Sequence, residues 1–165
     1  MYNVEIMLSQ VEQFLNNLLQ EINNLGIDVN NLKIDHIAYS TNSSEKYENL
    51  LPEFMKEGEL VKEAMISNRR VAVIKLINPI KYKNQLITAM ELIEPIEGEK
   101  TILGWEHAEF LVDNYDDLLN KYPSLEWNTK NKDRENFSRI KLVLPSGKEV
   151  KFLNTPVLVS ARIKE

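Results

Sequence analysis

The 165-residue chain contains no cysteine, which excludes a disulfide framework, a thiolate metal site and a cysteine nucleophile. Glycine is also scarce, with five residues in the whole chain, and dinucleotide-binding folds are therefore not expected. No glycine-rich phosphate loop, serine nucleophile elbow or zinc-finger spacing is present. No stretch approaches the roughly 18 consecutive apolar residues of a membrane span. The N-terminus lacks the basic and apolar regions of a signal peptide.

Basic residues are in the minority: 20 lysines and arginines against 25 acidic residues give a formal net charge of −5. This balance argues against nonspecific binding to nucleic acids or to anionic membranes. The 43% of hydrophobic and 27% of charged residues are ordinary for a globular protein. Together these values predict a single soluble domain over residues 1–165, which we expect in the cytoplasm.

Residues 5–26 have the period of an amphipathic helix. Apolar residues recur at spacings of three and four, and polar residues fill the opposite face. Gly26 stands where a left-handed C-terminal cap is expected. The apolar stripe consists of Val11, Phe14, Leu15, Leu18, Leu19, Ile22 and Leu25. We expect this stripe to lie in the core or in a dimer interface, because it is too short for a coiled coil.

The rest of the chain shows the same order of elements twice, in residues 33–95 and 104–154. Each half begins with an alternating strand, continues with a capped helix and ends in further strands. The later strands of the first half are expected at 59–66, 70–77 and 86–93, with turns at 67–68 and around 78–79. Those of the second half are expected at 125–129, 137–144 and 148–153. The pattern predicts an internal repeat of a βαβββ unit.

The two histidines of the chain occupy matching places in this repeat. Asp35-His36 stands in the first strand of one unit, and Glu106-His107 stands in the first strand of the other. Because side chains alternate along a strand, both histidines fall on the face opposite the residues that contact the helices. Random placement of two histidines in 165 positions would rarely give this arrangement.

Acidic residues are expected on the same face as the histidines. Glu109 shares the face of His107, and alternation places Glu91 there as well. Glu94 lies three residues further, and a shift of one residue in register would exchange the two faces. The pattern therefore leaves open which of these two glutamates, Glu91 or Glu94, accompanies the histidines.

These stretches resemble the vicinal oxygen chelate superfamily of glyoxalase- and dioxygenase-like proteins, and within it the YecM-like proteins of bacteria. The resemblance covers residues 32–153 and is carried by Asp35-His36-Ile37, Asn68-Arg69-Arg70, Glu91-Leu92, Gly104-Trp105-Glu106-His107 and Val150-Lys151-Phe152. It implies an α+β fold in which paired βαβββ units form an open, cup-shaped mixed sheet, with an extra N-terminal helix.

The resemblance also implies a divalent metal ion on the floor of the cup, with ligands from the first and last strands of each unit. These positions correspond to His36, Glu91, His107 and the strand 149–153. Two histidines and a carboxylate suit Zn²⁺, Ni²⁺, Mn²⁺ or Fe²⁺. Leu153 stands where the YecM-like pattern usually has histidine. The missing ligand leaves either an extra open coordination position or no tight metal site.

The function that the resemblance implies is metal-assisted chemistry on, or binding of, a small anionic molecule. Glu109 is then the candidate catalytic group for proton transfer, or a carboxylate that orients an imidazole. Lys75 and Lys151 are candidates for binding the anion, or partners of Glu91 in a salt bridge. Superfamily members isomerise, oxygenate, add thiols or sequester a ligand, so the fold does not fix the reaction.

Two alternatives remain at this point. A metal-free cup that binds a small molecule is favoured by Leu153, which makes the floor more apolar. An interaction module would use the stripe of the first helix to recruit a partner. Superfamily members often pair units across subunits, so the cup forms either within one chain or between the two chains of a homodimer.

Overall fold

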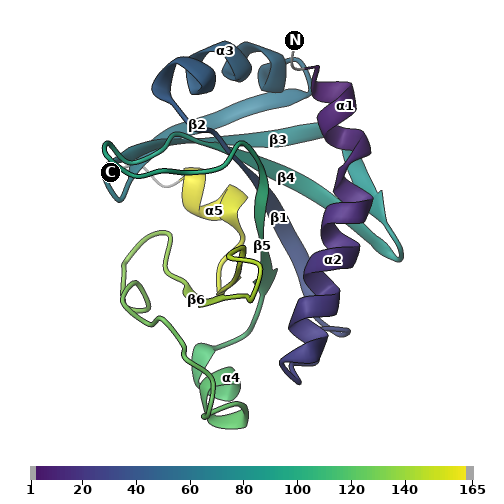
Figure 1. The fold of residues 1–165 in the computed structure, drawn as a ribbon, viewed down its shortest axis with the longest axis vertical. Helices are drawn as coiled ribbons and strands as arrows, with labels where there is room; N and C mark the ends of the chain where they lie inside the picture. Colours follow the sequence, from purple (N-terminus) through teal and green to yellow (C-terminus); the bar gives the residue numbers. More distant parts are fainter. Residues whose placement is uncertain (1–2, 163–165) are drawn as a thin grey trace.

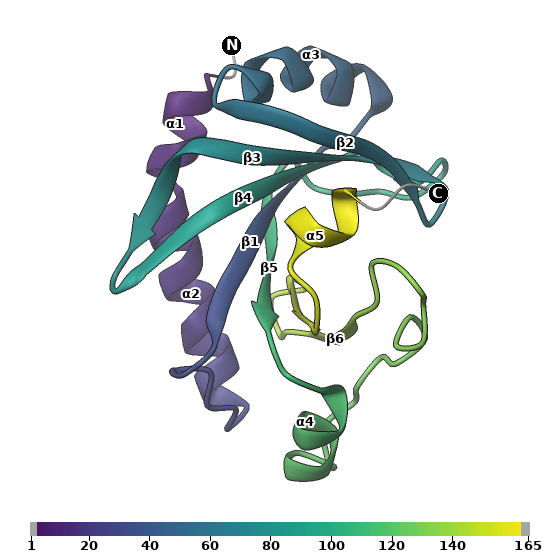
Figure 2. The same ribbon diagram turned by 180° about the vertical axis from the view of Figure 1, so that it is seen from behind.

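The structure is a computed structural model that describes residues 3–162. One mixed sheet curves around α5, and α1 and α2 cross its opposite face (Figures 1 and 2). The elements in order are α1 (Val4–Ser9), α2 (Val11–Asn24), β1 (Lys33–Ser40), α3 (Ser44–Met55), β2 (Gly58–Ile66), β3 (Arg69–Tyr82), β4 (Gln85–Ile93), β5 (Gly104–Leu111), α4 (Tyr115–Lys121), β6 (Ile140–Val143), β7 (Glu149–Leu153) and α5 (Val157–Arg162). No helix within residues 3–162 is both long and apolar enough to cross a membrane.

The pairing of the strands confirms the paired βαβββ architecture. In the described residues the sheet has seven strands in the order β2-β3-β4-β1-β5-β7-β6. The first strand of each unit pairs in parallel with the last, β1 with β4 and β5 with β7. The two first strands, β1 and β5, pair antiparallel and join the units. The cup is therefore formed within one chain, and its central strands carry both histidines.

The second unit has less regular structure than the sequence predicts. A strand was expected at 125–129, but the structure has a single bridge between Asn128 and Lys141 there. The strand expected from 137 is shorter and begins at Ile140. Phe137, with φ of 56°, interrupts extended backbone just before it. The prediction failed because apolar alternation does not reveal such local breaks.

Helix caps and an apolar layer explain how the helices are placed. Ser43 and Asn114 stand at corresponding places after the first strand of each unit, and their side chains cap α3 and α4. The stripe of the first helical segment is buried against the sheet. That segment is divided at Gln10 into α1 and α2, although one helix over 5–26 was expected. No glycine or proline marks the division, and the stripe continues through it to Val4 and Met7.

Two further elements differ from the sequence prediction. β3 runs on to Tyr82, so the turn expected around 78–79 is wrong. The pairing of β3 with β4 shifts between Lys75 and Ile80. Pro79 is tolerated there because the irregular pairing does not need a hydrogen bond from its backbone nitrogen, which carries no hydrogen. Helix α5 lies after the last strand, where no helix was predicted from the sequence. Its Val157 and Ala161 pack on the concave face of the sheet.

Gly58, the first residue of β2, approaches the backbone of β3 closely. A Cβ atom at this position would lie 2.0 Å from the carbonyl oxygen of Lys75. We expect Gly58→Ala to lower the free energy of unfolding by about 2–3 kcal/mol, measured by urea denaturation. Glu59→Ala, at the next and exposed position, is the matched control and should change it by about 0.5 kcal/mol or less. Equal stability of the two variants would contradict the close approach.

Candidate metal centre

Two histidines and two glutamates converge on the concave face of the central strands. His36 comes from β1, Glu91 from β4, and His107 and Glu109 from β5. All four residues are at most 1% exposed. One potential ligand atom of each lies within 4.8 Å of those of the other three. The structure thus brings together the three metal ligands predicted from the sequence and adds Glu109 to them.

The carboxylates face the Nε2 atoms of both imidazoles. His36 Nε2 lies 2.9 Å from Glu109 Oε2 and 3.3 Å from Glu91 Oε1. His107 Nε2 lies 3.2 Å from Glu109 Oε2 and 3.9 Å from Glu91 Oε1. The second oxygens, Glu91 Oε2 and Glu109 Oε1, are buried without a hydrogen-bond partner. A buried acceptor without a partner is costly, and a cation held by these oxygens would satisfy them.

Each histidine is oriented by the acidic residue that precedes it. His36 Nδ1 lies 2.7 Å from Asp35 Oδ2, and His107 Nδ1 donates a hydrogen bond to Glu106 Oε2 when it carries the proton. An imidazole whose Nδ1–H is held by a carboxylate presents the lone pair of Nε2, as metal-ligating histidines do. Both Nε2 atoms therefore point toward the two glutamates.

A β-bulge in each unit allows each histidine to contact the acidic residue that precedes it. The pairing of β1 with β5 shifts between Ile34 and His36, which leaves Asp35 unpaired as an extra residue. It shifts again between Ala38 and Tyr39 of β1, which leaves Glu106 of β5 as the extra residue. A bulge changes the direction of a side chain, so each acid reaches the imidazole beside it instead of the opposite face. The two units repeat the same arrangement of acid, bulge and histidine.

The cluster carries an excess of negative charge when both imidazoles are neutral. Two cations, Arg139 and Lys151, are buried beside it. Four carboxylates lie in or against it: Asp35, Glu91, Glu106 and Glu109. Two negative charges then remain, which a divalent cation would balance. Buried charges are normally paired or coordinate a metal, so this excess favours a bound cation.

In the absence of a metal, the same groups pair with one another. Burial alone lowers the pKa of His36, but the carboxylates of Glu109 and Glu91 raise it well above its usual value. Burial raises the pKa of Glu91, and His36 outweighs this and lowers it. For Glu109, Arg139 and His36 overcome the effect of burial and hold the pKa of the carboxyl well below its usual range. His36 thus serves as the cation of the metal-free cluster.

The register of β7 places Lys151 at the position that corresponds to Glu91. Glu91 pairs with the residue two positions after His36, and Lys151 pairs with the residue two positions after His107. Leu153 lies two residues further along β7, in an apolar cluster that includes Val157 of α5. A lysine therefore stands where the symmetry of the units would place a fourth ligand.

The fourth member of the cluster is Glu109, which comes from β5. The symmetry of the two units would instead place a fourth ligand on β7. Glu109 was predicted from the sequence to transfer protons or to orient an imidazole, and not to bind the metal. A signal was present, because Glu109 stands two residues after His107 and alternation puts both on one face. Arg139 Nη1 also donates to Glu109 Oε2 at 3.1 Å, so this carboxylate contacts three nitrogen-bearing side chains.

The other predicted site residues take three different positions. Glu94 lies outside the cluster and pairs with Arg70 at 2.6 Å; the hydrogen bond from Arg70 lowers the pKa of Glu94 to about 2. Lys151 is buried beside the cluster, and its burial together with nearby Arg139 lowers its pKa. Lys75 is exposed on β3, opposite Ala89 of β4, and does not belong to the cluster. The structure thus selects Glu91 over Glu94.

Comparisons with known proteins agree with the resemblance seen in the sequence. The profile of the YecM protein family matches residues 3–163. An uncharacterised protein of Haemophilus influenzae is 32% identical over 78 residues, which cover 47% of this chain and 41% of that protein. Protein YecM of Escherichia coli K12 is 30% identical over 86 residues, 52% of this chain and 46% of that protein. The matched segments thus span less than half of either curated relative.

Two solved structures are similar to this chain to different degrees. A structural-genomics structure described as Protein EC4020 superposes with a TM-score of 0.72 at 24% identity, covering 94% of this chain and 91% of that chain. A methylmalonyl-CoA epimerase has a TM-score of 0.49 at 16% identity, with 74% of this chain and 94% of that chain covered. The first of these similarities covers nearly the whole chain.

Proposed function

Because the chain belongs to the YecM family and buries two histidines and two glutamates in one cluster, we propose that it is a metal-dependent protein of the vicinal oxygen chelate type. It acts on, or binds, a small anionic molecule. The observation that carries this proposal is the convergence of both Nε2 atoms on two carboxylates that each keep one buried, unpartnered oxygen. A cation is the group that satisfies all of these atoms together.

His36, Glu91 and His107 hold the metal in this proposal, and Glu109 lies within reach as a fourth ligand. Nitrogen and carboxylate oxygen ligands suit Zn²⁺, Ni²⁺, Mn²⁺ and Fe²⁺. When bound, such an ion supplies a Lewis acid that stabilises negative charge developing on substrate oxygens. The two preceding acids, Asp35 and Glu106, fix the direction of the imidazoles.

Glu109 is also the candidate catalytic group for proton transfer. Its Oε1 has no partner, whereas its Oε2 is held by Arg139 and lies close to both imidazoles. Arg139 and His36 keep its pKa low, so the carboxylate is ionised, and its role in proton transfer requires that Oε1 is not bound to the metal. Lys151, buried opposite Glu109 on β7, is proposed to bind the anion. The anion-binding role of Lys75 stays a prediction.

The metal-free alternative rests on a different observation. Lys151 occupies the position that corresponds to Glu91, and a buried lysine beside the cluster opposes the binding of a cation. The two functions differ in what stabilises the protein. A metal-free cup is stabilised by a small molecule in the presence of chelator. The metal-dependent protein is stabilised by divalent ions even when no small molecule is added.

Asp35→Asn tests the proposed centre without removing a ligand. Asp35 Oδ2 contacts His36 Nδ1 and accepts a hydrogen bond from the backbone N–H of Val157 at 3.0 Å. The substitution keeps the shape and removes the charge that orients the imidazole. We expect the metal dissociation constant to rise by about 10- to 100-fold, measured by competition with a chromophoric chelator.

Asp113→Asn is the matched control, because Asp113 is exposed and lies outside the cluster. Its metal affinity should equal that of the unchanged protein. Chelator-treated protein that takes up none of the four ions would refute the proposed function. Equal affinities of Asp35→Asn and Asp113→Asn would refute the role of Asp35.

A further inference from the structure

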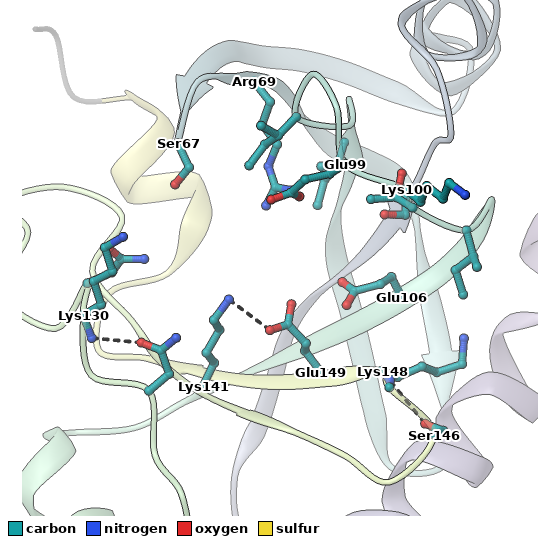
Figure 3. A pocket seen from close by; sticks show the side chains of 18 of the residues that line it. Ser67, Arg69, Glu99, Lys100, Glu106, Lys130, Lys141, Ser146, Lys148 and Glu149 are labelled. Atoms are coloured by element: carbon teal, nitrogen blue, oxygen red, sulfur yellow. Dashed lines mark hydrogen bonds and ion pairs between the residues drawn. The ribbon is translucent and has the colours of Figure 1, made fainter.

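A cavity of about 570 Å³ opens beside the metal centre (Figure 3). Ile93 of β4 and Ser40 of β1 line it; Ile93 lies two residues beyond Glu91, and Ser40 lies four residues beyond His36. Glu106 lines it as well and contacts Nδ1 of His107. The cavity therefore lies beside the cluster, although none of the four cluster residues lines it. Its volume suits a small organic molecule.

The walls of this cavity carry positive charge, although the chain as a whole has a formal charge of −5. Three acidic residues line it: Glu99, Glu106 and Glu149. Six basic residues line it: Arg69, Lys100, Lys130, Arg134, Lys141 and Lys148. Glu149 is paired with Lys141 at 3.0 Å. The excess of positive charge in an acidic protein indicates an anionic ligand.

Arg69 gives the strongest evidence for such a ligand. It extends from the start of β3 into the cavity (Figure 3). Its Nε is buried and has no hydrogen-bond partner. A buried donor without a partner is costly, and a guanidinium presents donors in a fork that matches phosphate or carboxylate oxygens.

Arg134 brings a second guanidinium to the same cavity. Its Nη2 donates to Ser67 Oγ at 3.0 Å, and Ser67 lies in the turn that precedes Arg69. This contact ties the segment after α4 to the turn between β2 and β3, so residues from both units line one cavity. The Lys141–Glu149 ion pair also lines it, and Figure 3 shows this pair across from Arg69.

We propose that this cavity binds the charged end of a multiply charged small anion, which carries phosphate groups or neighbouring carboxylates, with Arg69 and Arg134 as its main contacts. The inference rests on the proposed function in one respect: the ligand is the small anionic molecule proposed there. The anion site itself requires no metal, because its contacts come from side chains outside the cluster.

The test uses chelator-treated protein and two probes, inorganic pyrophosphate and tricarballylate, with binding measured by calorimetry. We expect the unchanged protein to bind at least one of them. Arg69→Gln and Arg134→Gln should each weaken that binding by about tenfold or more. Lys33→Gln is the control, because it removes the same charge at an exposed position outside the cavity. Its affinity should stay within about twofold of the unchanged protein.

The two probes distinguish the chemistry of the ligand. Binding of pyrophosphate alone assigns a phosphorylated molecule, binding of tricarballylate alone assigns a polycarboxylate, and each result supports the anion site. Arg69→Lys, which keeps the charge but not the fork, replaces Arg69→Gln if the latter fails to fold, and it should bind more weakly than the unchanged protein. Absence of binding by both probes would overturn the inference, as would equal affinities of Arg69→Gln and Lys33→Gln.

Failure here is distinguishable from failure of the proposed function. Loss of anion binding in Arg69→Gln, in a protein that takes up no divalent ion, would leave the anion site standing and refute the metal centre. Metal uptake by a protein that binds neither probe would refute the anion site and leave the metal centre standing.

Discussion

Glu109→Gln is expected to lower the free energy of unfolding of the metal-free protein by about 3–5 kcal/mol. The Glu109 carboxylate lies 2.9 Å from His36 Nε2, 3.2 Å from His107 Nε2 and 3.1 Å from Arg139 Nη1. Arg139 is 8% exposed, and its other acceptor is the carbonyl oxygen of Phe137. Glutamine would leave this guanidinium buried without the nearest opposite charge, which is the costly way to break a buried ion pair.

Urea denaturation of chelator-treated protein measures this effect. Glu126→Gln is the matched control, because Glu126 is exposed and should change stability by about 0.5 kcal/mol or less. A double-mutant cycle with Arg139→Gln adds a second check. The double variant should lose less free energy of unfolding than the sum of the losses in the two single variants. Stability of Glu109→Gln equal to that of Glu126→Gln would show that the cluster is not held by this carboxylate.

Divalent ions are expected to stabilise the chelator-treated protein. At about 100 times the dissociation constant, a bound ion adds about 2.7 kcal/mol to the free energy of unfolding. For a chain of this size, the melting temperature then rises by about 5–10 °C. The physical reason is that the ion satisfies the free oxygens of Glu91 and Glu109 and balances the excess negative charge of the cluster.

Thermal denaturation with Zn²⁺, Ni²⁺, Mn²⁺ and Fe²⁺, each added separately, measures the shift and identifies the preferred metal. His36→Ala/His107→Ala removes both imidazoles and should abolish the shift. If none of the four ions raises the melting temperature of the unchanged protein, the metal centre is absent and the metal-free cup becomes the better account.

The repeat and the shared face of the histidines were predictable from the sequence. Alternation along each strand puts His36 and His107 on one face, and the structure brings them together with Glu91 and Glu109. The repeat also predicted that the first strands of the two units occupy corresponding positions. Both inferences depend on local periodicity, which the sequence contains directly.

The bulges were not predictable, and they decide how the histidines are held. Strict alternation sends Asp35 and Glu106 to the face opposite the histidines. One unpaired residue in each unit brings them back to the imidazoles. A bulge is a property of the pairing between two strands, so one strand's pattern does not reveal it.

The residue of β7 that corresponds to Glu91 was also not predictable from the sequence, for a similar reason. The resemblance pointed to Leu153, because family patterns compare positions by spacing along the chain. The register of β7 against β5 instead places Lys151 opposite Glu109, in the position that corresponds to Glu91. The homodimer and the cytoplasmic location inferred from the sequence stay predictions.

The metal content of untagged protein, purified without chelator, tests the central claim most directly. Elemental analysis of the unchanged protein and of His36→Ala/His107→Ala gives the comparison. We predict about one equivalent of a single divalent ion in the unchanged protein and its loss in the double variant. Less than about a tenth of an equivalent in the unchanged protein, with no uptake when ions are added, would contradict the metal centre.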